Sequence, residues 1–174
     1  MQSDDTDPDA ADGTERLVTM VVMYPPLERL VRFRMDTISA LVRRLAAESG
    51  STKVAAFTSS FVGAPSNIWM EGISPIDLQR TVDCFHLLAY GRDASASNSD
   101  LVFFLEMIRD PTRLNLTLNL GFPATATLAQ AASQIDFALR KGVRRFSFFN
   151  YGFLGESRLQ WIRDLACLAR KAGE

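Results

Sequence analysis

The sequence predicts an α/β protein of about five parallel βα units, which form part of an eight-stranded (βα)8 TIM barrel. Short apolar segments rich in Val, Leu and Phe alternate with longer amphipathic segments, and the short ones recur about every 30 residues. Helix-length connections between strands require parallel pairing through right-handed crossovers. Neither GxGxxG nor GxxxxGKS/T occurs, which disfavours the alternative, an open doubly wound sheet that binds a nucleotide.

The composition is typical of one globular domain, with 174 residues, 47% of them hydrophobic and 22% charged. The first fifteen residues contain no basic residue and six acidic ones: Asp4, Asp5, Asp7, Asp9, Asp12 and Glu15. Removing these six from the 20 acidic residues leaves 14, against 19 basic ones. We therefore expect a disordered acidic leader at 1–15 and a partial barrel domain at 16–174.

The same composition excludes several environments and partners. The amino-terminal segment lacks the basic and apolar regions of a signal peptide, and no apolar stretch is long enough to cross a membrane. The basic residues are spread along the chain without a nucleic-acid-binding signature. We expect a cytoplasmic protein that binds neither nucleic acid nor membrane.

The first part of the domain is expected to be a strand, a helix and a second strand. Residues 17–24 (LVTMVVMY) are rich in Val and Met and stop at two prolines. Residues 27–49 carry apolar side chains at helical spacing, and Gly50 ends that pattern. Residues 53–61 (KVAAFTSSF) form the second predicted strand.

A short helix, a strand, a loop and a helix are expected next. Ser74 suits the N-cap of the short helix and Pro75 its first position. The third strand covers 82–90 (VDCFHLLAY), the polar loop GRDASASNSD covers 91–100 and ends in a helix cap, and the helix covers 101–110.

Residues 113–122 (RLNLTLNLGF) are the clearest strand, because leucines alternate strictly with Asn115, Thr117 and Asn119. The last predicted strand also carries a polar residue, Ser147, at an alternate position. A barrel interior accommodates such residues better than a sheet that lies between two helix layers, so this pattern favours the barrel.

The carboxyl-terminal third is expected to be a helix, a strand and a helix. Either Thr125 or Thr127 caps an Ala-rich helix, and Gly142 lies just past its end. Residues 143–152 (VRRFSFFNYG) form the fifth strand, and 156–171 form the last helix.

Binding sites of parallel α/β folds lie at the carboxyl ends of the strands, where this sequence places aromatic and polar residues. The candidate ligand-binding residues are Tyr24, Phe61, Tyr90, Arg92, Asn119, Phe122, Asn150 and Tyr151. Aromatic faces suit sugar rings and also apolar or heteroaromatic ligands. In the alternative interpretation, the rings only fill the top of the barrel.

Catalytic carboxylates are scarce at these strand ends. Asp93, three residues past Tyr90, is the single candidate, whereas a glycoside hydrolase usually needs two carboxylates. We expect the principal acids to belong to strands that this chain lacks.

His86 is the only histidine, and Cys84 and Cys167 are expected to be buried thiols, so the sequence indicates no metal site and no cofactor.

Three segments carry a resemblance to a known family, namely DCFHLLAYG (83–91), LTLNLGF (116–122) and RKGVRRFSFFNYGFL (140–154) followed by RLQWIRDL. Together they resemble the last strands of a glycoside-hydrolase-like TIM barrel, and the likeness covers residues 16–170. The resemblance implies a truncated barrel domain that binds or acts on an oligosaccharide or polysaccharide. It implies Tyr90, Asn150 and Tyr151 as lining residues. The absence of an acid pair at the strand ends leaves open that the domain is inactive as this chain alone.

Two other functions stay open at this point. The domain could be a non-catalytic assembly module, whose partner is a second copy or the missing amino-terminal barrel half. It could also be a barrel enzyme that binds a phosphate-bearing ligand through backbone amides near Gly121 and between Gly152 and Gly155.

Overall fold

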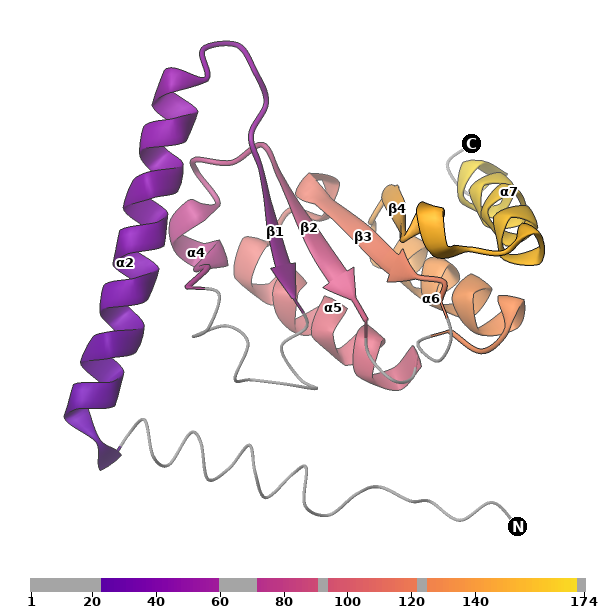
Figure 1. Ribbon diagram of the computed structural model, residues 1–174, viewed down its shortest axis with the longest axis horizontal. Coiled ribbons are helices and arrows are strands. Elements are labelled where there is room, and N and C mark those ends of the chain that lie inside the picture. Colours follow the sequence, from indigo (N-terminus) through magenta and orange to yellow (C-terminus); the bar gives the residue numbers. More distant parts are fainter. Residues whose placement is uncertain (1–22, 60–71, 91–93, 122–124, 172–174) are drawn as a thin grey trace.

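The computed structural model describes residues 23–59, 72–90, 94–121 and 125–171, and these contain a four-stranded parallel sheet with helices (Figure 1). The elements are α2 (Pro25–Glu48), β1 (Ala55–Ser59), α4 (Pro75–Leu78), β2 (Cys84–Ala89), α5 (Ala94–Ile108), a 3-10 turn (Pro111–Arg113), β3 (Leu114–Asn119), α6 (Leu128–Arg140), β4 (Arg145–Phe149), a second 3-10 turn (Tyr151–Phe153) and α7 (Glu156–Lys171).

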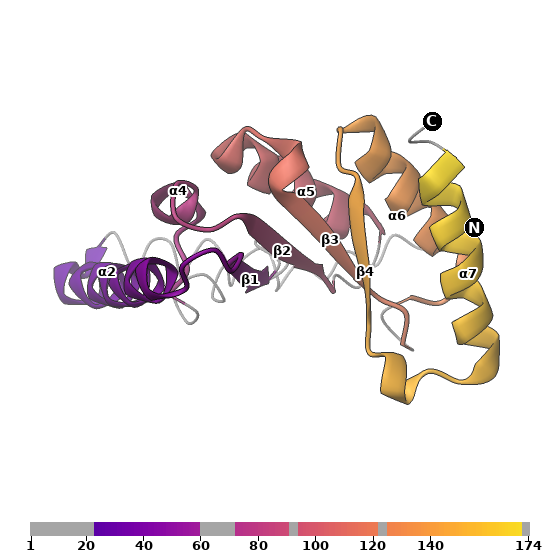
Figure 2. The same ribbon diagram turned by 90° about the horizontal axis from the view of Figure 1, so that it is seen from above.

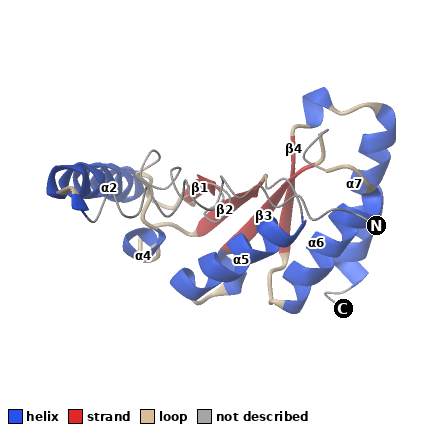
Figure 3. Cartoon of the chain, turned by 90° about the horizontal axis from the view of Figure 1, so that it is seen from below, coloured by secondary structure: helices blue, strands red, loops and turns tan. Residues whose placement is uncertain are grey.

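The strands pair in the order β1-β2-β3-β4, and every pairing is parallel. The predicted α/β class and the parallel βα repeat are therefore confirmed. Spatial order follows sequence order without the reversal that characterises a doubly wound sheet, as far as the described strands extend. Figures 2 and 3 show α5 and α6 on one face of this sheet, with α2 beside the β1 edge.

The hydrophobic core lies between the sheet and the helices that cover it. Alternate residues of β2 and β3 point into this layer and are buried, as the period of two in the sequence predicts. Phe85 of β2 is fully buried and meets Phe104 of α5 edge to face, with 5.4 Å between the ring centroids. Other fully buried side chains are Leu78, Leu87, Leu101, Leu114, Leu118, Leu120, Ile135, Val143 and Leu165.

Local signals in the sequence set the helix ends. The Ser74 hydroxyl accepts a hydrogen bond from the backbone N–H of Asp77, which caps α4 as predicted. Of the two candidate caps for α6, Thr127 is the one used. Gly142 follows α6 with φ of +87°, which strains any other residue, and a Cβ there would make a tight contact of 3.0 Å with Pro111 Cγ.

Arg113 ties the start of β3 to the preceding unit. Its guanidinium donates hydrogen bonds to the backbone carbonyls of Gln79 and Val82, which follow α4. Both carbonyls lie past the last residue of α4, so the arginine fixes the connection that leads into β2.

Three sequence predictions are wrong. Residues 94–100, predicted as part of a polar loop, form the first turns of α5. Their polar side chains are not all in solvent, since Ser97 and Asp100 are buried, so this segment packs as part of the helix. The predicted strand 17–24 does not extend through its last two residues, since Tyr24 is the N-cap of α2 and two prolines occupy its first turn. Cys167 is exposed, whereas Cys84 is buried as expected.

Some predictions fall on residues that the structure does not describe. The acidic leader at 1–15, residues 17–22 of the first predicted strand and residues 91–93 of the polar loop are among them. Within the described ranges, no helix is both long and apolar enough to cross a membrane.

Candidate functional site

The sheet face opposite α5 and α6 presents side chains without a covering helix among the described residues (Figure 2). We call it the open face. Strand register arranges its side chains in three rows. The amino-end row is Phe57, His86, Asn115 and Arg145; the middle row is Ser59, Leu88, Thr117 and Ser147; the carboxyl-end row is Tyr90, Asn119 and Phe149. Phe57 and Phe149 are 58% and 44% exposed, so apolar surface on this face meets solvent.

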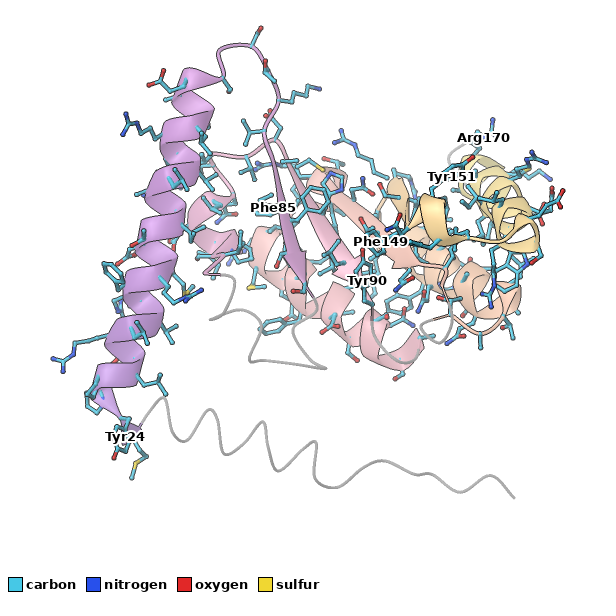
Figure 4. All side chains as sticks on the ribbon, viewed as in Figure 1. Tyr24, Phe85, Tyr90, Phe149, Tyr151 and Arg170 are labelled. Atoms are coloured by element: carbon cyan, nitrogen blue, oxygen red, sulfur yellow. The ribbon has the colours of Figure 1, made fainter. Side chains whose placement is uncertain are left out.

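The carboxyl-end row contains an aromatic pair beside an amide. The rings of Tyr90 and Phe149 lie 5.2 Å apart, centroid to centroid, with a tilt of 34° between their planes, and Figure 4 shows them next to each other. Asn119 is the register partner of Phe149 on the neighbouring strand. Burial raises the pKa of the Tyr90 phenol above its usual 10.0, so the hydroxyl stays protonated and can donate a hydrogen bond.

Hydrogen bonds hold the turn that follows Asn119. The Asn119 Oδ1 accepts from the backbone N–H of Gly121 at 2.9 Å, and the Thr125 hydroxyl donates to the Asn119 carbonyl at 2.6 Å. These bonds explain why Thr125, the cap candidate that α6 does not use, is nevertheless buried. The two bonds attach Gly121 and Thr125 to the carboxyl end of β3.

Arg158 of α7 forms hydrogen bonds with backbone carbonyls near the carboxyl end of β3. Its Nη1 donates to the carbonyls of Leu120 and Thr125 at 3.1 and 2.6 Å, and its Nη2 to the carbonyl of Ala126 at 3.5 Å. The guanidinium also lies 3.9 Å from the centroid of the Trp161 ring. One side chain therefore connects the last helix to the end of β3.

The amino-end row combines an aromatic ring with basic and amide groups. Phe57 and His86 stack with 4.5 Å between ring centroids. Asn115 Nδ2 donates to Ser147 Oγ at 2.8 Å. Within the described residues, the Arg145 guanidinium makes no ion pair and no side-chain hydrogen bond.

His86 is expected to make the stability of the chain depend on pH. Burial lowers its pKa below the usual 6.5, and the positive charge of Arg145 lowers it further. The unfolded chain therefore takes up this proton first as the pH falls, so the free energy of unfolding should decrease below about pH 6.5.

Urea denaturation between pH 8 and 5 measures this dependence. His86→Gln removes the only histidine of the chain, so it should flatten the decrease in this range while the response of the carboxylates at lower pH persists. An equally steep decrease in the variant would contradict the assignment to His86.

The structure brings only some of the predicted site residues together. Tyr90 and Asn119 share the carboxyl-end row, and Asn150 follows Phe149 directly. Tyr151 is 70% exposed, and Tyr24 lies at the start of α2, well away from Tyr90 in Figure 4. The remaining candidates lie outside the described residues: Phe61, Arg92, Asp93 and Phe122.

Sequence reasoning missed several residues that matter on this face. Phe149 was treated only as part of a strand, although the alternation Arg145, Ser147, Phe149 places it on the same side as the polar residues of β3. Phe57 and Arg145 could have been found by the same count. Arg158 carries no such signal, because its partners are backbone carbonyls distant in the sequence.

The open face carries no carboxylate among its described residues, and the described part of the chain holds no cluster of metal-ligating side chains. On the helical side, a groove of about 590 Å³ lies between α5 and α6, and another of about 520 Å³ lies between α4 and α5. Neither groove is lined by a residue that the sequence had marked as a ligand-binding candidate.

The fold and this face define an α/β protein with a sequentially ordered parallel sheet, one face of which is packed with helices and the other lined by aromatic and polar side chains. No protein-family model, curated protein or solved structure matches the chain. The function is therefore argued from these residues.

Proposed function

We propose that the chain is a carbohydrate-binding portion of a glycoside-hydrolase-like TIM barrel, and that its open face is the barrel interior. The sequential strand order and the helices on one face support this proposal, because both are properties of a barrel wall. The polar residues Asn115, Thr117 and Asn119 on the other face support it as well, since a sheet between two helix layers would carry apolar residues there.

The Tyr90–Phe149 pair is the observation that supports a carbohydrate as the ligand. Two adjacent rings at the carboxyl ends of their strands offer an apolar surface on which the C–H faces of a sugar can stack. The Tyr90 hydroxyl and the amide of Asn119, the register partner of Phe149, supply hydrogen-bonding groups for sugar hydroxyls. This arrangement of stacking and amide groups fits a neutral polyol better than a nucleotide phosphate.

Binding rather than hydrolysis is the activity proposed for these strands. The open face has no carboxylate in its described part, and hydrolysis of a glycoside usually needs two. Asp93, the weak catalytic candidate, lies outside the described residues. A complete barrel with acids from further strands would be the catalytic form.

Isothermal titration calorimetry with cellohexaose, maltohexaose, xylohexaose and chitohexaose tests the proposal. We expect at least one to bind, and Tyr90→Ala or Phe149→Ala to weaken that binding about tenfold, which corresponds to roughly 1.4 kcal/mol of lost stacking. Phe33→Ala is the matched control, because Phe33 is 67% exposed on α2, away from the pair. A folded chain that binds none of the four would refute the proposal.

A role in assembly is the second candidate, and the exposure of Phe57 on the open face favours it. Parallel sheets normally have both faces covered, so a second polypeptide would stabilise this one. Sedimentation at micromolar concentration should then show a dimer or a larger species, whereas a stable monomer would contradict this role.

A further inference from the structure

The outer edge of β4 is unpaired among the described residues. β4 pairs with β3 on one side, and no other described strand pairs with its second side. The Phe149 carbonyl accepts a hydrogen bond from the backbone N–H of Leu120, just past β3, and the backbone groups of successive strand residues point to opposite edges. The N–H and C=O groups of Phe146 and Phe148 therefore point to the outer edge, where they can pair with another strand.

The side chains of β4 are also incompletely covered. Every residue of β4 is half-buried or exposed, whereas β2 and β3 each bury four of their six residues. Phe146 and Phe148 pack against the core on the helix side of the sheet but keep part of their surface in solvent. From Phe146 to Phe149 the strand carries neither a proline nor a charge, which are devices that usually keep an exposed edge from pairing.

The helix that follows β4 leaves this edge accessible. α7 packs against α6, and Arg158 attaches it to carbonyls between β3 and α6, so α7 lies on the helix side of the sheet (Figure 2). In a complete barrel a neighbouring strand would cover the edge. In this chain, none of the described strands does so.

The sequence of β4, Arg-Phe-Ser-Phe-Phe, is self-complementary about its central residue. If two copies pair antiparallel around a twofold axis at Ser147, that serine lies opposite its own copy. Phe146 then lies opposite Phe148 of the second copy, and the two residues exchange both backbone hydrogen bonds. Arg145, which makes no ion pair among the described residues, lies opposite Phe149 of the second copy and can contact its ring.

We propose that two copies of the chain associate by antiparallel pairing of their β4 strands, with Ser147 at the twofold axis. The two four-stranded sheets then form one continuous sheet. The pairing covers aromatic surface of Phe146 and Phe148 on the helix side. This inference goes beyond the carbohydrate site and does not depend on it, because Tyr90 contacts Phe149 from the β2 side and the second copy approaches from the outer edge.

Disulfide cross-linking tests the register of the two strands. Ser147→Cys and Arg145→Cys are each made with Cys167→Ser, because Cys167 is exposed and Cys84 is buried. The pairing brings the two copies of position 147 to about 4.5 Å between Cα atoms, which a disulfide can bridge. The two copies of position 145 are about 13 Å apart, at about 3.3 Å for each of four residues, which is too far. We expect diamide to link the first variant into dimers and to leave the second unlinked.

Sedimentation equilibrium measures the association of the unmodified chain, which should be a reversible dimer at micromolar concentrations. Arg145→Ala should weaken dimerisation at least about tenfold, because each dimer contains the contact with Phe149 twice. Arg43→Ala is the matched control and should leave the dimer unchanged. Arg43 is exposed on α2, which lies beside the opposite, β1 edge of the sheet.

The outcomes separate this interface from other forms of association. A chain that stays monomeric at every concentration would overturn the proposal. A dimer in which Arg145→Cys links as readily as Ser147→Cys, or in which neither links, would assign the association to another surface and would also overturn it. Neither result bears on carbohydrate binding, which calorimetry tests separately. Circular dichroism checks that each variant retains the fold.

Discussion

Phe85→Ala is expected to lower the free energy of unfolding by about 3–5 kcal/mol. Phe85 is fully buried in β2, and its ring packs edge to face on Phe104 of α5, so truncation leaves a cavity at the centre of the helix-covered layer. Domains are commonly stable by only about 5–15 kcal/mol, so the variant should lose a substantial fraction of the stability of the chain.

Urea denaturation followed by circular dichroism measures the loss. Phe153→Ala is the control, because Phe153 is 86% exposed and its removal should change the free energy of unfolding by less than about 1 kcal/mol. A loss below about 1 kcal/mol for Phe85→Ala would show that this layer is not the core of the chain.

Arg158→Met is expected to cost about 2–3 kcal/mol, because hydrogen bonds that involve a charged group contribute about that much. The variant keeps an apolar stem and loses the guanidinium that binds the carbonyls of Leu120, Thr125 and Ala126. Since the same turn contains the hydrogen bonds of Asn119, oligosaccharide binding should weaken together with stability.

Arg163→Met on the same helix is the control for Arg158. Among the described residues, Arg163 donates only to the side chain of Gln160, three residues earlier, so its loss should cost less than about 0.5 kcal/mol. Arg158→Lys keeps the charge without the planar set of donors and should show an intermediate loss. Equal unfolding free energies for the two methionine variants would contradict the role given to Arg158.

The strands of the described region could be predicted because their residues alternate in burial. Leu114 and Leu116 face the helices and Asn115 and Thr117 face away, so one count of the sequence identifies both the strand and its two sides. Parallel pairing followed from the helices between strands. The start of α5 could not be predicted, because Ser97 and Asp100 resemble loop residues until their burial is known.

The site was harder to predict than the fold. Tyr90 and Asn119 were found because strand ends can be counted along the sequence. The contact of Tyr90 with Phe149 depends on the register of two strands that are not adjacent in the sheet. The hydrogen bonds of Arg158 join it to carbonyls more than thirty positions earlier in the sequence. Register and long-range backbone contacts are tertiary properties that no local pattern encodes.

The strand register has a consequence for how ligand preference could change. The row that contains Phe57 in the middle of β1 meets β4 at its first residue, so the strands are progressively offset across the sheet. The two rings of the aromatic pair are consequently held differently: Phe149 is the last residue of β4, whereas Tyr90 lies one residue past the end of β2. If the pair binds a ligand as proposed, substitution of Tyr90 should change ligand preference at less cost to folding than substitution of Phe149, which is part of the paired strand.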